Sequence, residues 1–238
     1  DYSGSTKGDK LTKEKKAAGV FIDTLARNPR NRVGFVVFNS QSKLVSGLTS
    51  DFAFVKQEIN GLRDGNGFTC IKCGIELANS HLAANGRAGL PKVLVLLSDG
   101  YANRPQPKEQ AIQLTRDTVS QGHQQHRITY YPIGFSGDAP KIKTIKTGGS
   151  ITVITSGGDE GVNEPLMKEL ATLGGGRYYF APTNADLETV LRDLGVALIC
   201  QQSPQVAQPA PQQGSEPVVV QPIVNAGAAT PPTSTTFR

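Results

Sequence analysis

The chain has 238 residues, a formal net charge of +5 and only 6% aromatic residues. This length suffices for one substantial domain and a tail. No run of about 18 apolar residues occurs, so we expect no membrane span in this chain. The lysines are not interleaved with aromatic residues, which argues against nucleic acid as a partner.

Helices and strands are predicted to alternate through the first 200 residues. Apolar residues at helical spacing predict helices, and apolar, β-branched runs predict strands. The apolar faces of the expected helices span residues 10–28, 52–62, 71–82, 108–121, 161–173 and 187–198. The expected strands cover residues 32–38, 42–48, 93–97, 128–135 and 177–180.

This alternation predicts an α/β domain over residues 1–200, with a doubly wound, mainly parallel sheet and helices on both faces. In such sheets, ligands bind outside the carboxyl ends of the strands. Asp99 follows the strand at 93–97, and Thr69 opens a helix after a glycine-rich loop. We therefore expect both residues at one edge of the sheet, together with the loop at the start of the chain.

The first six residues carry oxygen-bearing side chains at alternate positions. Asp1, Ser3 and Ser5 share one side of the segment if it forms a tight loop. Three such hard donors favour Mg²⁺ or Mn²⁺ over zinc, which prefers nitrogen and sulfur. The alternative is that Ser5 or Thr6 caps the following helix.

Three cysteines are present, two of them in a C-x-x-C pattern at the start of a predicted helix. Cys70 and Cys73 form this pattern, and Cys200 ends the last helix. The pattern fits a redox pair, half of a zinc site, or a structural pair that is buried or joined by a local disulfide. No second paired set of cysteines or histidines completes a zinc site, which favours the structural interpretation.

The composition changes after Cys200. Residues 201–238 hold seven of the fifteen prolines and seven glutamines, with two charged side chains, Glu216 and Arg238. Such a segment cannot bury enough apolar surface to fold alone. It is interpreted as a Pro/Gln/Thr-rich tail or linker, through which assembly is possible.

Four segments together resemble a von Willebrand factor A-type domain over residues 1–198. They are Asp1-Tyr2-Ser3-Gly4-Ser5, Thr69 after its glycine-rich loop, Leu97-Ser98-Asp99-Gly100, and Gly175-Gly176-Arg177-Tyr178-Tyr179-Phe180. The order of the three loops is a specific feature of the resemblance.

The resemblance implies a Rossmann-like fold and a metal-ion-dependent adhesion site. Its ligands would be Asp1, Ser3, Ser5, Thr69 and Asp99, with hydroxyls in direct contact and carboxylates often acting through water. A site with few direct carboxylates leaves Mg²⁺ able to accept an exposed Asp or Glu of a protein partner. We therefore expect a non-enzymatic adhesion or interaction module in an extracellular or cell-surface setting.

Two other functions remain open at this point. One is a structural subunit of a surface filament or pilus, with the tail as a connector. The other is a Mg²⁺-dependent hydrolase, for which no general base is evident. His81 lies inside a predicted helix, and His123 and His126 lie in a turn away from the expected ligand face.

The chain departs from the family pattern at two places. The family has a buried strand directly before its first loop, whereas this sequence begins at Asp1. Either upstream residues supply that strand, or another segment fills its place, for which Val218-Val219-Val220 is the candidate. The second departure is an insertion at 136–160, where residues 151–155 predict a small hairpin strand. We expect it on the ligand face, with Lys141, Lys143 and Lys146 favouring an acidic partner.

Overall fold

The computed structural model describes residues 1–98, 102–135, 141–147, 150–156 and 162–201. Its helices are α1 (Gly8–Leu25), α2 (Phe52–Asn60), α3 (Ile71–Asn85), α4 (Lys108–His126), α5 (Glu164–Leu173) and α6 (Asn184–Gln201). Its strands are β1 (Val33–Phe38), β2 (Ser42–Thr49), β3 (Lys92–Ser98), β4 (Ile128–Phe135), β5 (Lys141–Thr147), β6 (Ser150–Ser156) and β7 (Tyr179–Ala181).

Every predicted helix and strand is present, and most differences lie at the ends of elements. The largest is in α4, which continues to His126, so His123 and His126 lie in its last turn and not in a free turn. The strand expected at 177–180 begins later, at Tyr179. The strand expected at 151–155 is β6, which pairs antiparallel with β5 from Lys141↔Ser156 to Thr147↔Ser150.

The core of the sheet is parallel, as the alternation predicts. Strand β4 lies between β3 and β7 and runs parallel to both, with the β3 register extending from Lys92↔Ile128 to Ser98↔Gly134. Strands β1 and β2 form a separate antiparallel pair. In the described residues β1 and β3 are not hydrogen-bonded to each other, which agrees with the expectation that the strand preceding the first loop in the family is not part of this sequence.

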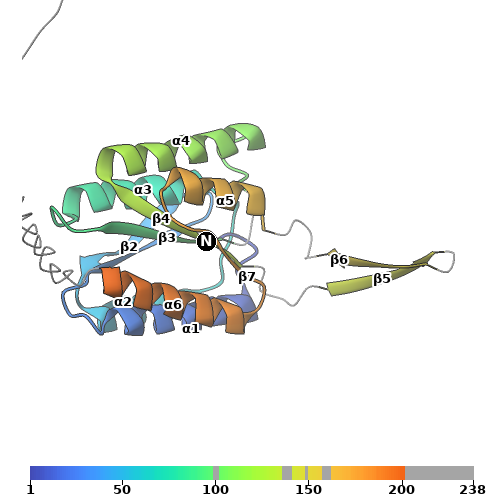
Figure 1. The fold of residues 1–238 in the computed structure, drawn as a ribbon, viewed down its shortest axis with the longest axis horizontal. Helices are drawn as coiled ribbons and strands as arrows, with labels where there is room; N and C mark the ends of the chain where they lie inside the picture. Colours follow the sequence, from blue (N-terminus) through green and yellow to red (C-terminus); the bar gives the residue numbers. More distant parts are fainter. Residues whose placement is uncertain (99–101, 136–140, 148–149, 157–161, 202–238) are drawn as a thin grey trace, which may run out of the picture. The chain divides into compact units, whose positions relative to one another are not determined.

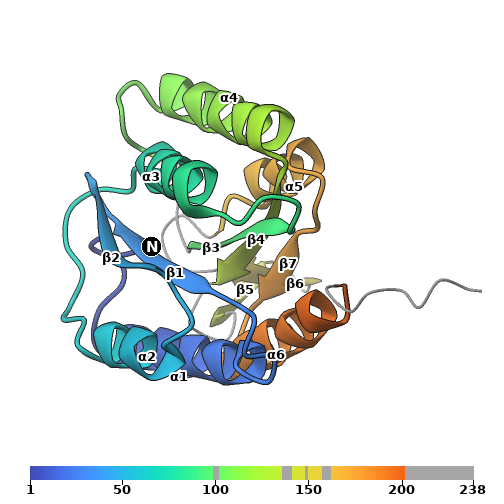
Figure 2. The ribbon, with the colours of Figure 1, turned by 90° about the vertical axis from the view of Figure 1, so that its left-hand side faces the viewer.

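Helices cover both faces of the sheet (Figure 1). Helices α1, α2 and α6 lie on one face, and α3, α4 and α5 lie on the other (Figure 2). Strand β4 contributes side chains to the hydrophobic cores on both faces of the sheet, because alternate residues of a strand point to opposite faces. Tyr130 packs with the α3–α5 layer, whereas Ile133 and Phe135 pack with α1 and α6. The doubly wound architecture is thus confirmed.

Two expectations fall on parts of the chain outside the described residues. Val218–Val220 belongs to the stretch 202–238, and the side chains of Lys141, Lys143 and Lys146 are likewise outside what the structure describes. Both expectations remain predictions. In the described parts of the chain, no helix has both the length and the apolar character that crossing a bilayer demands.

Candidate metal centre

The start of the chain folds into a tight loop. The Thr6 amide donates to the Ser3 carbonyl at 3.0 Å, and the Ser3 amide donates to Oδ1 of Asp1 at 2.9 Å. The hydroxyl oxygens of Ser3 and Ser5 lie 3.1 Å apart, and Ser3 is only 2% exposed. Alternate side chains of this loop therefore converge, as the sequence predicts.

The alternative in which Ser5 or Thr6 caps the first helix is wrong. Helix α1 begins at Gly8, its N-cap position is Lys7, and no side chain of that residue caps it. The Gly8 amide instead donates to the Asp64 carboxylate at 2.9 Å. This leaves the two serine hydroxyls without a capping role.

A glycine-rich loop packs directly against the first loop. The Gly4 amide donates to the Gly67 carbonyl at 3.0 Å, and the Gly65 amide donates to the Thr6 carbonyl at 2.8 Å. A Cβ atom on Gly65 would lie 2.4 Å from the Ser3 carbonyl oxygen, so only glycine permits this approach. Thr69, which is 5% exposed, follows directly after this glycine-rich loop.

The third segment contacts both loops. Ser98 donates its hydroxyl to Oδ2 of Asp1 at 2.7 Å. The Thr69 amide donates to Oδ1 of Asn103 at 2.7 Å, and the Asn103 amide donates to the Thr69 carbonyl at 3.0 Å. Asp99 lies outside the described residues, but its neighbour Ser98 touches the first loop.

Two ionisable groups are buried beside the first loop. Burial lowers the pKa of the Asp1 amino group from 8.0 to about 6, against the opposing effect of the Glu14 carboxylate. Burial also raises the pKa of Glu14, which the Asp1 amino group and Lys10 oppose. The loop thus lies at the edge of the core, with Ser3 buried and Ser5 exposed.

The residues present fit a hard divalent cation. Neighbouring ligands of octahedral Mg²⁺ lie about 2.9 Å apart, because each bond measures about 2.05 Å. The distance of 3.1 Å between the Ser3 and Ser5 hydroxyls is close to that spacing. Both Asp1 carboxylate oxygens already accept hydrogen bonds, which suits a carboxylate that orients the loop and acts through water.

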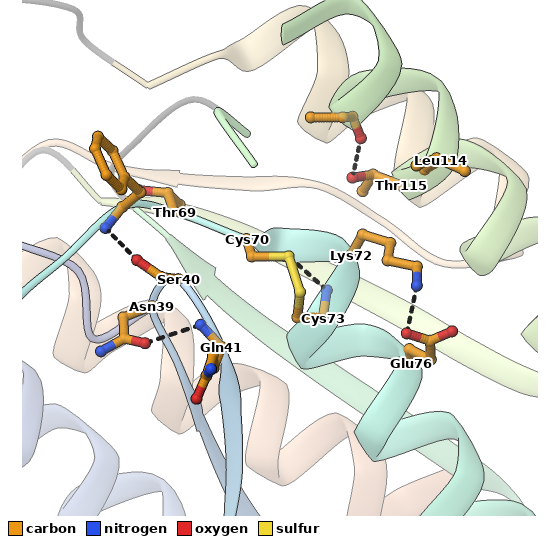
Figure 3. The surroundings of a disulfide bond; sticks show 12 residues. Asn39, Ser40, Gln41, Thr69, Cys70, Lys72, Cys73, Glu76, Leu114 and Thr115 are labelled. Atoms are coloured by element: carbon orange, nitrogen blue, oxygen red, sulfur yellow. Dashed lines mark hydrogen bonds and ion pairs between the residues drawn. A yellow bond between two sulfur atoms is a disulfide. The ribbon is translucent and has the colours of Figure 1, made fainter. Parts of the chain in front are cut away.

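The C-x-x-C pattern forms a disulfide beside Thr69. Cys70 and Cys73 are joined across a Cα–Cα distance of 5.3 Å at the start of α3 (Figure 3). The Cys70 amide donates to the Asn39 carbonyl at 2.7 Å. The local-disulfide interpretation is therefore confirmed, and in this state neither sulfur has a thiolate to offer zinc.

The disulfide should stabilise the turn that follows Thr69. We expect the Cys70→Ser/Cys73→Ser variant to lose about 2 kcal/mol of unfolding free energy, the value for closing a four-residue loop. Thermal and denaturant unfolding, with and without a dithiol reductant, measures this. Reductant should lower the stability of the native chain, and of a Cys200→Ser control that keeps the disulfide, to that of the double variant, and it should leave the double variant itself unchanged. Equal stability of oxidised and reduced protein would contradict the prediction.

Sequence reasoning missed several residues of this region. Asn103 and Ser98 connect the loops through contacts that no short motif indicates. Phe68 is 49% exposed, and the Arg104 guanidinium lies 3.6 Å from its ring centre. An exposed aromatic ring and a positive charge therefore flank Thr69.

Two of the three histidines are held by backbone hydrogen bonds. Nε2 of His81 accepts the Leu48 amide at 3.0 Å, and Nδ1 of His123 lies 2.9 Å from the Ile128 carbonyl, to which it donates. Both imidazole rings make structural hydrogen bonds, and both lie on helices, α3 and α4, rather than on the three loops of the candidate site.

The fold and the site define a class of protein. It is a doubly wound α/β domain with a hydroxyl-rich loop cluster at the carboxyl edge of its parallel strands. The sequence profile described as von Willebrand factor type A domain matches residues 1–193. The chain belongs to this family.

Solved structures share the fold at low sequence identity. BatB from Bacteroides thetaiotaomicron aligns with a TM-score of 0.58 and 16% identity, covering 84% of this chain and 96% of that one. The PilB minor pilin from Streptococcus sanguinis aligns at 0.62 and 15%, covering 84% and 56%. The pilus adhesin SpaC from Lactobacillus rhamnosus GG aligns at 0.60 and 13%, covering 84% and 30%. Among curated proteins, the search returns no significant match.

Proposed function

We propose that this domain is a metal-dependent adhesion or protein-interaction module. Mg²⁺, or Mn²⁺ in its place, is held by Asp1, Ser3, Ser5, Thr69 and Asp99, and an exposed Asp or Glu of a protein partner completes the coordination. The observation that carries the proposal is the pair of hydroxyls of Ser3 and Ser5, 3.1 Å apart. Their loop is hydrogen-bonded to Ser98 and to the glycine-rich loop that precedes Thr69.

The chemistry of the donors supports an acidic partner. Hydroxyl ligands are neutral, so a cation bound mainly by hydroxyls keeps most of its charge and attracts a further carboxylate. The Arg104 guanidinium above Phe68 adds a positive charge beside Thr69. Complementary charge of this kind directs the encounter and selects the partner more than it adds affinity.

A surface location fits the same proposal. The Cys70–Cys73 disulfide suits an oxidising compartment. Two proteins of similar fold are described as a minor pilin and a pilus adhesin, of which this chain spans 56% and 30%. They motivate the second candidate function, a structural subunit of a surface filament or pilus that assembles through the tail.

An enzymatic role receives less support from the site. A Mg²⁺-dependent hydrolase requires a general base within reach of the metal-bound water. His81 and His123 both make backbone hydrogen bonds on other elements. We therefore propose a binding module and not a catalyst.

A peptide array tests the proposed function directly. Peptides that carry one exposed Asp or Glu are paired with otherwise identical peptides that carry Asn or Gln. Binding of the chain is measured in Mg²⁺, in Mn²⁺ and in a chelator. We expect binding to the acidic member of a pair only when a cation is present. Acidic binding that persists in the chelator would contradict the proposal.

A further inference from the structure

The amino ends of strands β1, β3 and β4 carry a cluster of positive charge. The chain enters these strands through residues 26–32, 85–92 and 121–127, and the three segments contain no Asp or Glu. They contain six cationic side chains: Arg27, Arg30, Arg32, Arg87, Lys92 and Arg127. The net charge of the whole chain is +5, so the rest of it is close to neutral.

Hydrogen bonds and strand register bring the three segments together. The Arg32 guanidinium donates to the Asn85 carbonyl, and the Arg87 guanidinium donates to the Arg30 carbonyl. Lys92 is paired with Ile128 in the register of β3 and β4, so the residue before Ile128, which is Arg127, lies at the same end. The six cations therefore lie at one end of the domain, which we call the basic end.

The basic end has no carboxylates to neutralise it. Among the described residues, none of the six cations forms an ion pair with a carboxylate. Asp23 pairs with Lys56, and Asp51 caps α2. Four of the six cations are exposed: Arg27, Arg30, Arg87 and Arg127. Exposed cations gathered on one surface create a positive potential that attracts an anionic partner.

An apolar turn projects from the same surface. The Leu90 amide donates to the Arg87 carbonyl at 3.4 Å, which closes a turn through Gly89. A Cβ atom on Gly89 would meet nothing within 4 Å, so the turn faces open space. Leu90 is 48% exposed, and Pro91 beside it is exposed as well. The basic end thus carries an apolar tip, Leu90-Pro91, with a cation on either side of it in the chain, Arg87 and Lys92.

Helix ends explain part of this arrangement. Helices α1, α3 and α4 all finish at this end, and a cation that follows a helix C-terminus is stabilised by the helix dipole. Arg27, Arg87 and Arg127 have that position. The dipole accounts neither for the other three cations nor for the exposed Leu90 among them.

We propose that the basic end docks on an anionic phospholipid surface. Guanidinium groups bind phosphate through two parallel hydrogen bonds, and each cation near such a surface raises the affinity about five-fold. Leu90 and Pro91 enter the boundary between headgroups and acyl chains, where an apolar group bordered by cations is favoured. A soluble polyanion gains nothing from contact with the apolar tip, so a bilayer is the occupant that uses both features.

Docking of this kind leaves the candidate metal centre facing away from the bilayer. Strands β1 and β3 run from the basic end to the first loop, where Phe38 accepts the Tyr2 amide and Ser98 donates to Asp1. The length of β3 separates the two ends by roughly 20 Å. Docking does not rest on cation binding, because none of the six cations belongs to the candidate metal centre.

Co-sedimentation with vesicles tests the inference. Vesicles of phosphatidylcholine alone are compared with vesicles that also contain phosphatidylglycerol, in a chelator so that the candidate metal centre plays no part. Arg27→Gln/Arg30→Gln removes two exposed cations from the basic end. Lys7→Gln/Lys43→Gln is the matched control, because it removes two exposed cations at the other end, where Lys43 is opposite Val37 of β1.

We expect the native chain to bind only the vesicles that contain phosphatidylglycerol. The affinity of Arg27→Gln/Arg30→Gln for them should fall at least about 10-fold, whereas that of the control should change little. Added salt should weaken the binding, because it screens exposed charges.

A tryptophan at position 90 reports whether the apolar tip enters the bilayer. The chain has no tryptophan, so Leu90→Trp introduces a single one. Phe68→Trp is the matched control, in an exposed position of the glycine-rich loop. We expect vesicles with phosphatidylglycerol to shift the emission of Leu90→Trp to shorter wavelength, and brominated lipids to quench it. Neither effect should occur in Phe68→Trp.

Several outcomes would overturn the inference. They are no binding to either kind of vesicle, equal binding to both, equal losses in the two charge variants, or an emission shift in Phe68→Trp in place of Leu90→Trp. Binding that polyphosphate displaces, without an emission shift in Leu90→Trp, would assign the basic end to a soluble polyanion instead.

Discussion

The Ser3→Ala/Ser5→Ala variant should lose at least about 100-fold in affinity for Mg²⁺, measured by calorimetry. Changing residues that only support a metal ligand already costs 10- to 100-fold, so removing two direct ligands should cost more. The two hydroxyls lie 3.1 Å apart in a loop where neither caps a helix. Stability without the cation should change little, because the backbone hydrogen bonds of the loop stay intact.

Ser80→Ala is the matched control for this variant. Ser80 is an exposed serine within α3 whose hydroxyl donates to the Glu76 carbonyl of its own helix. Its removal should leave the affinity for Mg²⁺ unchanged. If both variants bind the cation as the native chain does, the assignment of Ser3 and Ser5 as ligands is wrong.

Gly65→Ala should weaken the site without removing any ligand atom. The new Cβ would meet the Ser3 carbonyl oxygen at 2.4 Å and the Tyr2 carbonyl oxygen at 2.7 Å. Both contacts involve backbone, so the two loops must separate. We expect a loss of about 1–3 kcal/mol in unfolding free energy and an affinity for Mg²⁺ reduced at least about 10-fold.

Gly19→Ala controls for the added methyl group. A Cβ there meets only the Cε atom of Lys56, at 3.9 Å, inside helix α1. Alanine is favoured over glycine in a helix by about 1 kcal/mol, so this variant should be as stable as the native chain or slightly more stable. Denaturant unfolding measures the stability of Gly65→Ala and of Gly19→Ala, and calorimetry measures the affinity of each variant for Mg²⁺. A Gly65→Ala protein that matches the native chain in both would show that the loops tolerate separation.

The elements were predictable because each has a local signal. The run Val93 to Leu97 indicates a strand that is covered on both faces, and it lies at the heart of β3. The apolar spacing of α1 and α6 likewise indicates which faces they bury. Alternation of such segments predicts the doubly wound layers.

The connections between loops were not predictable, because they join residues far apart in the chain. Ser98 bonds Asp1 and Asn103 bonds Thr69, contacts that depend on the carboxyl ends of the strands meeting at one edge. The sequence also left the capping role of Ser5 and Thr6 open. In the structure the N-cap position falls on Lys7, without a side-chain cap, and the Gly8 amide bonds Asp64 across 56 positions.

The division of the sheet into two separate ladders also depends on contacts between residues far apart in the chain. Local patterns place β1 and β3 correctly but do not show which strands are neighbours. The bonds from Asp1 to Leu97 of β3 and from Tyr2 to Phe38 of β1, which place the start of the chain between these strands, likewise join residues far apart in the sequence. A pattern confined to one segment cannot encode this arrangement.

The most direct test of the account is the position of the cation itself. Mn²⁺ is paramagnetic and broadens the amide resonances of nearby residues in an NMR spectrum. We expect substoichiometric Mn²⁺ to broaden the amides of Ser3, Ser5 and Thr69 first, and excess Mg²⁺ to reverse the effect. Broadening centred elsewhere, such as at the end of α4 around His123 and His126, or no broadening at all, would contradict it.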